Sequence, residues 1–173
     1  LFLYTPGVPK HPWIMPFIEF ALSPEGQEIV ESVGFISQQV EIEPIKASEK
    51  MPLEYARIVG ESQGRLSVNF RFRPGSTEID AKAIRDMDRV VKFLAAPENR
   101  NKQVYLLGFS DSSGAADANL QLSQERAEEV ARQMTLRGVP VAAVLGLGDA
   151  LPVASNSTKA GQEKNRRVEV WLD

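Results

Sequence analysis

The chain contains 173 residues, which is enough for one domain with an appendage or for two small domains. Its composition, 43% hydrophobic and 25% charged, excludes a disordered or collagen-like chain, and no apolar run reaches the ~18 residues of a membrane span. With 20 basic and 23 acidic residues, the charge balance does not favour nucleic-acid binding.

Charge is distributed unequally along the chain, which indicates two modules. Residues 1–50 contain three lysines and seven glutamates, whereas the remainder contains 17 basic and 16 acidic residues, including every arginine. We therefore predict a mostly helical fragment over residues 1–45, a polar linker over residues 46–64 with one helical turn at residues 53–58, and a second domain over residues 65–173.

The first module is expected to hold a short buried strand and two helices. Residues 1–5 are apolar and are followed by a Pro-Gly turn, whereas Trp13, Phe17 and Phe20 share one face of a helix. Residues 23–25 read Ser-Pro-Glu, a strong helix start: a hydroxyl cap, then proline where no N–H is needed, then an acid near the positive helix end.

The second of these helices is expected to end at Gly34, with a strand following over residues 35–40. So few elements seldom bury enough surface to fold alone. We therefore expect Trp13 or Phe17 to be buried against the second module, another copy of the chain or upstream polypeptide.

The first module also carries a recognisable stretch over residues 17–40, which reads FIEFALSPEGQEIVESVGFISQQV. It resembles the C-terminal end of a periplasmic phosphate-binding protein of the ABC-transporter type. In that family the loops that grip phosphate lie well upstream of this stretch. The resemblance therefore implies no phosphate site within this chain.

The second module begins with a strand, a helix and another strand. Residues 66–72 alternate apolar and polar side chains, as in a half-buried strand. An amphipathic helix follows and ends before Pro97; its apolar positions are Ile84, Met87, Val91 and Leu94. Residues 103–109 form a nearly continuous apolar strand, which favours a central position in a sheet.

A second helix then begins at Ser123 as N-cap, buries Ala127, Val130 and Met134, and ends at Gly138. Residues 141–147 and 167–172 supply two more strands. This order predicts an α+β fold, a βαβαβ mixed sheet with two helices packed on one face, next to the N-terminal mostly helical fragment.

The loop after the central strand holds the most informative pair of charged residues. Asp111 lies just past the strand's carboxyl end, where ligands often bind, and Arg126 follows fifteen residues later. A carboxylate and a guanidinium facing one hollow suit the ammonium and carboxylate of an amino acid. The alternative is structural: an Asp after a strand often caps a turn, and an Arg early in a helix is usually solvated.

The motifs of the second module favour a ligand site over a structural role for this pair. They resemble the OmpA-like C-terminal peptidoglycan-binding domain over about residues 65–173. The matching residues are Gly108, Asp111, Gly114, Asn119, Leu122, Ser123, Arg126, Ala127, Val130, Gly138, Val139, Gly146, Gly148, Pro152, Val153, Ala154, Asn156, Asn165, Arg166, Arg167, Val168 and Glu169. The resemblance implies that the aspartate and the arginine hold the amino-acid head of diaminopimelate in the peptidoglycan stem peptide.

Residue by residue, the resemblance places Asp111, Arg126, Ser110 and Asn119 in the ligand-binding site. Neighbours of the pocket are Phe109, Arg73 and Leu122. The chain departs from the family pattern at Phe109 in place of histidine and at Ser110 in place of threonine. Gln162 stands where Gly-Arg is common, and Arg71 or Arg73 stands where an acid is common. The added positive charge is expected either to favour acidic stem peptides or to weaken ammonium binding. Asn165 and Arg166 are expected to be structural.

The predicted function is therefore non-covalent binding of peptidoglycan, which anchors a periplasmic or outer-membrane-associated protein to the cell wall. The alternative is part of a phosphate or oxyanion receptor of an ABC transporter, which the wall domain only positions. We predict no enzyme, because the chain has no cysteine and His11 is its only histidine.

The predicted partners are peptidoglycan and an upstream solute-binding domain. Nucleic acid, a direct membrane span, cofactors and metals are not expected, and the oligomeric state stays open. The predicted location is the periplasm, in association with the cell wall or outer membrane.

Overall fold

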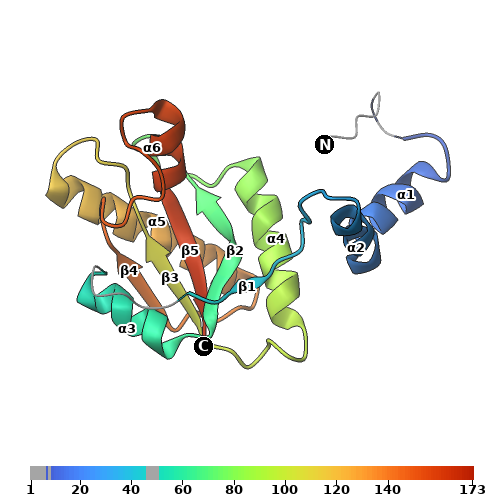
Figure 1. Cartoon of the computed structure of the whole chain (residues 1–173), viewed down its shortest axis with the longest axis horizontal. Helices are drawn as coiled ribbons and strands as arrows, with labels where there is room; N and C mark the ends of the chain where they lie inside the picture. Colours follow the sequence, from blue (N-terminus) through green and yellow to red (C-terminus); the bar gives the residue numbers. More distant parts are fainter. Residues whose placement is uncertain (1–6, 8, 46–50) are drawn as a thin grey trace. The chain divides into compact units, whose positions relative to one another are not determined.

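The computed structural model describes residues 7, 9–45 and 51–173 (Figure 1). It divides the chain into two compact units, Leu1–Gln39 and Val40–Asp173. The strand predicted over residues 1–5 lies outside the described residues.

The first unit contains helix α1, Ile14–Ala21, and helix α2, Pro24–Ser32. The predicted start of α2 is confirmed, because the Ser23 side chain accepts a hydrogen bond from the Gly26 backbone N–H at 3.2 Å. The two helices approach so closely that a Cβ on Gly26 would lie 2.0 Å from the Phe20 carbonyl oxygen. Gly34, with φ at +85°, follows α2 as expected.

One prediction for the first unit is wrong. Residues 35–40 form no strand; the strand of this region lies further on and belongs to the second unit. Trp13 and Phe17 are 73% and 59% exposed, and α1 has no buried residue. Their burial against the second module, another copy of the chain or upstream polypeptide stays a prediction.

The second unit is a five-stranded mixed sheet with four helices among its described residues. The strands are β1 (Ile42–Glu43), β2 (Gly64–Arg71), β3 (Val104–Gly108), β4 (Ala143–Gly146) and β5 (Arg167–Leu172). The helices are α3 (Leu53–Glu61), α4 (Ala81–Ala95), α5 (Ala116–Leu136) and α6 (Lys159–Asn165).

The strand order is β1-β2-β5-β3-β4, and only the β3–β4 pair is parallel. The α+β class and the mixed sheet are therefore confirmed. The last strand of the sequence, β5, lies in the middle of the sheet between β2 and β3, so its side chains are buried along its whole length.

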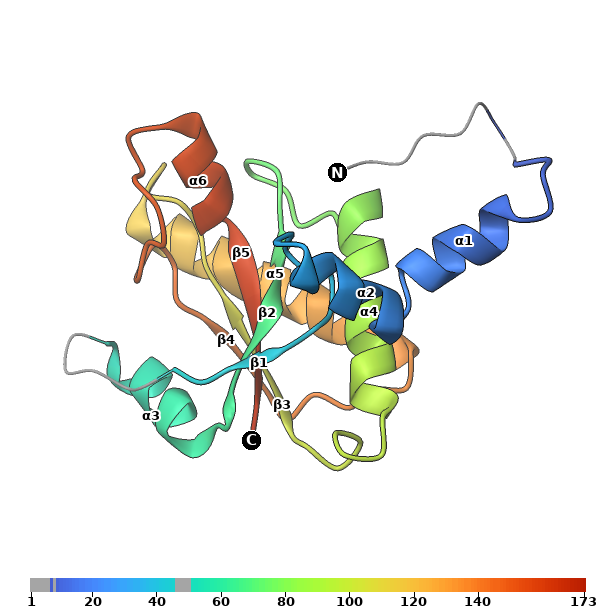
Figure 2. The same ribbon diagram turned by 45° about the vertical axis from the view of Figure 1, so that its right-hand side comes forward.

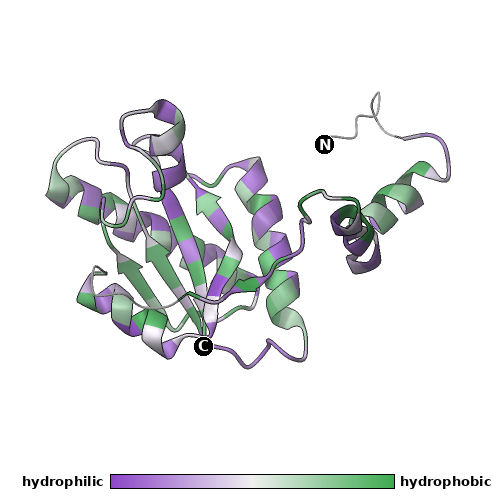
Figure 3. Ribbon diagram, viewed as in Figure 1, coloured by the Kyte–Doolittle hydropathy of each residue, from purple (hydrophilic) through white to green (hydrophobic). Residues whose placement is uncertain are grey.

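One face of the sheet is covered by α4 and α5, as predicted (Figure 2). Apolar side chains from both helices meet those of the strands in the main core, for example Met87 of α4, Val130 of α5 and Phe70 of β2, all no more than 1% exposed. Strands β3 and β4 are mostly hydrophobic, whereas hydrophilic and hydrophobic residues alternate along β2, β5 and the helices (Figure 3). This pattern is what amphipathic helices packed on a sheet require.

The other face carries a helix that the sequence did not predict in full. Residues 46–64 were expected to be a linker with one helical turn, but α3 runs for nine residues and buries Tyr55 and Val59. These two side chains pack against the second core cluster, which contains Leu107, Phe109 and Trp171. Since β1 also pairs with β2, residues 40–45 and α3 belong to the domain rather than to a connector.

Helix α5 begins at Ala116, seven residues before the predicted N-cap. Ser123, the predicted N-cap, lies within the helix and is turned inward, as is Asn119; they are 0% and 5% exposed. The Ser123 hydroxyl accepts a hydrogen bond from the Gly148 N–H at 2.9 Å and donates one to the Leu120 carbonyl oxygen at 2.7 Å. These contacts fix the first half of α5 against the end of the sheet, so they position the residues of the candidate site.

Within the part of the chain that the structure describes, no helix combines the length and hydropathy of a membrane span.

Candidate ligand-binding site

The loop from β3 to α5 holds Asp111 almost fully buried, at 6% exposure. Its Oδ2 atom lies 2.6 Å from Nη1 of Arg166, and its Oδ1 atom accepts a hydrogen bond from the Ser113 N–H at 2.8 Å. Burial acts to raise the pKa of Asp111, but the hydrogen bonds from Arg166 and Ser113 outweigh it, so the pKa lies below its ordinary value. The carboxylate is therefore ionised at neutral pH.

Arg126 lies in the third turn of α5 and is completely buried. Its guanidinium donates to three backbone carbonyl oxygens, those of Ser76 and Arg73 at 3.0 Å and that of Phe109 at 3.5 Å. It also lies over the Phe72 ring, 5.3 Å from the centroid. No carboxylate forms a salt bridge with Arg126 among residues 7, 9–45 and 51–173.

Burial lowers the pKa of Arg126 to about 10, and the nearby positive charge of Arg166 acts in the same direction. The Asp111 charge opposes this shift. The hydrogen bond from Arg126 to the Phe109 carbonyl oxygen, two residues before Asp111, holds Arg126 beside the same loop. The structure thus brings Asp111 and Arg126 into one site, and Arg126 remains a cation at neutral pH.

Arg166 is the charged residue of this site that the sequence did not assign to it. Its Nε donates to the Phe72 carbonyl oxygen at 3.0 Å while its Nη1 holds Asp111. The neighbouring Asn165, fully buried, accepts hydrogen bonds from the N–H groups of Val153 and Ala154. The two adjacent polar residues just before β5 were the available signal, but only the fold shows that Arg166 reaches the β3–α5 loop.

The other two predicted ligand-binding residues are buried with unsatisfied polar atoms. Ser110 is 4% exposed and Asn119 is 5% exposed. Neither the Ser110 Oγ atom nor the Asn119 Nδ2 atom has a hydrogen-bond partner among the described residues. Buried polar atoms are nearly always hydrogen-bonded, so these two atoms, one in the β3–α5 loop and one on α5, are available to a ligand or to water.

The predicted neighbours of the pocket differ in how they are placed. The Phe109 side chain is fully buried in the second core cluster, where the Arg167 guanidinium lies 3.8 Å from its centroid. The Phe109 side chain therefore packs in the core between α3 and the sheet. Arg73 is exposed and takes part through its carbonyl oxygen, which accepts from Arg126. Leu122 is half-buried on α5.

The site is closed in this structure, which corrects the expectation of an open hollow between the two charges. Arg126 has no exposed surface, because the backbone of the loop after β2 covers its guanidinium through the carbonyl oxygens of Arg73 and Ser76. The three charged side chains, Asp111, Arg126 and Arg166, sum to one positive charge. Such a site favours a ligand with a carboxylate, and the acidic Asp111 favours a cationic group beside it.

No group of three His, Cys, Asp or Glu side chains suited to a metal ion occurs in the described ranges.

A model of the OmpA family matches residues 71–166, more than half of the chain, and this stretch includes every residue of the site. The chain belongs to the OmpA family. The predicted resemblance of the second module is therefore confirmed, and the OmpA-family stretch contains Asp111, Arg126 and Arg166.

Individual relatives are similar to this chain over part of its length. The probable lipoprotein YiaD of Escherichia coli (strain K12) is 46% identical over 71 residues, 40% of this chain and 32% of that protein. The peptidoglycan-binding protein ArfA of Mycobacterium bovis is 42% identical over 84 residues, 47% of this chain and 25% of that protein. The chain thus spans about a quarter to a third of the length of these two relatives.

Among solved structures, the peptidoglycan-associated lipoprotein from Burkholderia pseudomallei superposes with a TM-score of 0.55 at 26% identity, covering 61% of this chain and 89% of that one. The relatives matched here are lipoproteins, peptidoglycan-binding proteins and outer-membrane proteins by name, and none is named as an enzyme. Their names confirm the predicted location in the periplasm, associated with the cell wall or outer membrane.

The OmpA-family match does not extend to residues 1–70. The resemblance of residues 1–45 to a phosphate-binding protein therefore stays a prediction that these comparisons do not support, as does the alternative of an oxyanion receptor.

Proposed function

We propose that this chain binds peptidoglycan non-covalently through the amino-acid head of diaminopimelate, and that it anchors a periplasmic or outer-membrane-associated protein to the cell wall. Membership of the OmpA family supports this proposal, as do relatives whose names include peptidoglycan-binding protein and peptidoglycan-associated lipoprotein. The role of the chain is binding rather than catalysis.

The observation that carries the proposal is the buried Arg126 guanidinium without a carboxylate partner among the described residues. A buried charge without a counter-ion costs free energy, and a ligand carboxylate removes that cost through a bidentate pair. Asp111 then accepts the ligand ammonium, while Ser110 and Asn119 supply the two polar atoms that have no partner among the described residues.

Binding in this way requires the loop after β2 to move. The ligand carboxylate replaces the carbonyl oxygens of Arg73 and Ser76 as the acceptor for Arg126. This loop is exposed at residues 73–75, and Gly75 has a φ of +63°, so the backbone there has few packing contacts to lose. We therefore propose that the loop opens when the stem peptide binds.

The test is a titration of the whole chain with the tripeptide alanyl-γ-glutamyl-diaminopimelate, followed by calorimetry. The matched ligand has lysine in place of diaminopimelate and so lacks the second amino-acid head. We expect saturable binding of the first tripeptide and at least about tenfold weaker binding of the second, since one charged pair contributes about 1.5–3 kcal/mol.

Variants Asp111→Asn and Arg126→Lys are expected to weaken binding by a similar factor, with circular dichroism verifying that they remain folded. The matched control is Arg132→Ala on the same helix, whose side chain is 59% exposed and pairs with Glu129. Full-strength binding by either site variant contradicts the proposal. Thermal stabilisation by inorganic phosphate, in the absence of any effect of the tripeptide, supports the receptor alternative instead.

A further inference from the structure

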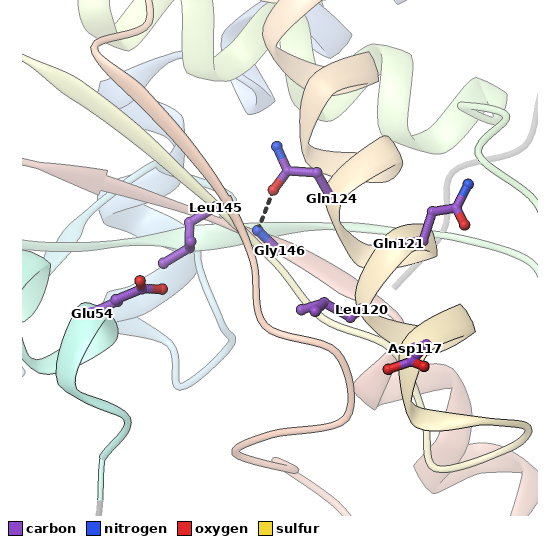
Figure 4. Close-up of a pocket in the computed structure, with 7 residues that line it drawn as sticks. All are labelled: Glu54, Asp117, Leu120, Gln121, Gln124, Leu145 and Gly146. Atoms are coloured by element: carbon purple, nitrogen blue, oxygen red, sulfur yellow. Dashed lines mark hydrogen bonds between the residues drawn. The ribbon is translucent and has the colours of Figure 1, made fainter.

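A second candidate site lies at the edge of the sheet, in a cavity of about 470 Å³ (Figure 4). It is lined by Leu145 and Gly146 of β4, by one face of the first half of α5, and by Glu54 of α3. None of its lining residues belongs to the predicted stem-peptide site, so the two sites are chemically independent.

Two residues of β4, Leu145 and Gly146, line this cavity, and β4 is an edge strand of the sheet. In the strand order β4 is terminal and pairs only with β3, and its first residue, Ala143, is exposed. An edge strand presents backbone N–H and C=O groups that can pair with another chain. At its far end the Gly146 N–H is already satisfied, because it donates to the Gln124 side chain at 2.6 Å, which leaves the preceding residues as the open stretch.

The walls of the cavity lie on opposite faces of the sheet. Helix α5 packs in the main core, whereas α3 packs in the second core cluster, and Leu145 points toward the latter. The α5 wall carries Asp117 and Leu120, and the α3 wall carries Glu54. No lysine, arginine or histidine lines the cavity, and neither carboxylate forms a salt bridge within the described part of the chain.

We propose that this groove binds an extended peptide segment of a partner protein, basic at both ends and apolar between them, as a sixth strand alongside β4. Successive side chains of a strand point to opposite faces, so two basic residues three positions apart reach the two walls. One meets Asp117 and the other meets Glu54, while the two apolar residues between them contact Leu120 and Leu145. Main-chain pairing supplies the affinity and the carboxylates select the sequence.

The probe that tests this is the capped hexapeptide acetyl-Thr-Lys-Val-Val-Lys-Thr-amide, titrated into the isotope-labelled whole chain and followed by amide resonances. We expect saturable shifts in residues 143–146 and in the first half of α5, together with slower hydrogen exchange of the Leu145 amide. The same peptide with glutamate for lysine, or with proline for the second valine, is expected to produce neither effect.

Glu54→Gln and Asp117→Asn are each expected to weaken binding of the lysine peptide by about three- to fivefold, the range of exposed ion pairs. The matched control is Glu98→Gln, an exposed carboxylate outside the cavity. An equal effect of the control, shifts scattered over the acidic surface, or binding of the glutamate peptide overturns the proposal. Shifts at residues 143–146 caused by the diaminopimelate tripeptide also overturn it, because the cavity would then bind the peptidoglycan stem peptide. If the hexapeptide does not bind, the proposal that the Asp111 site binds the stem peptide is not affected.

Discussion

Asp111 and Arg166, 55 residues apart in the chain, form an ion pair of 2.6 Å in which each side chain is only 9% exposed. The pair joins the β3–α5 loop to the beginning of β5. Arg126 lies beside this loop as well, because its Nη1 atom donates to the Phe109 carbonyl oxygen, two residues before Asp111. The geometry of the candidate site therefore depends on a contact outside the pair that the sequence singled out.

Replacement of Arg166 is expected to destabilise the fold strongly. Arg166→Ala leaves the Asp111 carboxylate buried without its partner and removes the bond to the Phe72 carbonyl oxygen. We expect a loss of about 3–5 kcal/mol in the free energy of unfolding, measured with urea at pH 7. The control is Arg57→Ala, because the Arg57–Glu61 pair is 78% and 56% exposed and is expected to contribute about 1 kcal/mol or less. Similar losses in the two variants would show that the buried pair has no special role.

The same pair predicts a dependence of stability on pH. Because the pKa of Asp111 in the folded chain lies below its unfolded value, about 3.9, the ionised carboxylate stabilises the fold at higher pH. This contribution is lost as pH falls through the lowered pKa. The difference in unfolding free energy between the native chain and Asp111→Asn is therefore expected to be largest near pH 7 and to shrink below about pH 4. A constant difference from pH 7 to pH 3 would contradict this prediction.

How much of this site was accessible from sequence depends on the distance along the chain over which each contact forms. Asp111, Ser110, Asn119 and Arg126 lie within one loop and one helix, so their motif spacing predicted that they would meet. Arg166 and the carbonyl oxygens of the loop after β2 come from segments far away in the sequence. A local sequence pattern does not predict which backbone oxygens accept hydrogen bonds from a buried guanidinium. For the same reason, the closed state of the site was not predicted.

The fold shows a similar division. The strands β2 to β5 and helix α4 followed from the pattern of apolar residues, which depends on burial, whereas the two-residue strand β1 was not predicted. The start of α5 was placed too late because Ser123 was taken as its N-cap, yet the Ser123 side chain faces inward and accepts a hydrogen bond from the Gly148 N–H. The helix α3 was underestimated because the burial of Tyr55 and Val59 depends on side chains that come later in the chain, such as Leu107 and Trp171.

The assignment of α3 to the domain can be tested on α3 itself. Tyr55 is 5% exposed; its ring packs edge-on against Trp171 at 5.5 Å, and its hydroxyl donates to the buried Glu169 carboxylate at 3.2 Å. Tyr55→Ala is expected to lower the free energy of unfolding by about 3–5 kcal/mol. Leu53→Ala, two residues earlier and 89% exposed, is expected to change it by no more than about 0.5 kcal/mol. Equal, small effects in urea unfolding would mean that α3 is a connector after all.

Gly108 determines how closely α5 approaches β3, and so how deeply Arg126 is buried. A Cβ at Gly108 would lie 2.0 Å from the Ser123 carbonyl oxygen. This is a backbone atom of α5, so a change of side-chain rotamer cannot relieve the clash. Gly108→Ala is therefore expected to push α5 outward, to cost about 1–3 kcal/mol in unfolding free energy, and to weaken binding of the diaminopimelate tripeptide.

The matched substitution is Gly60→Ala within α3, where no atom lies within 4 Å of the added Cβ. There the smaller backbone entropy of alanine in the unfolded chain is expected to raise stability by about 0.5–1 kcal/mol without changing tripeptide binding. Urea unfolding and calorimetry on both variants measure the two effects. A Gly108→Ala chain that is destabilised but binds the tripeptide at full strength would show that the position of α5 does not control the site.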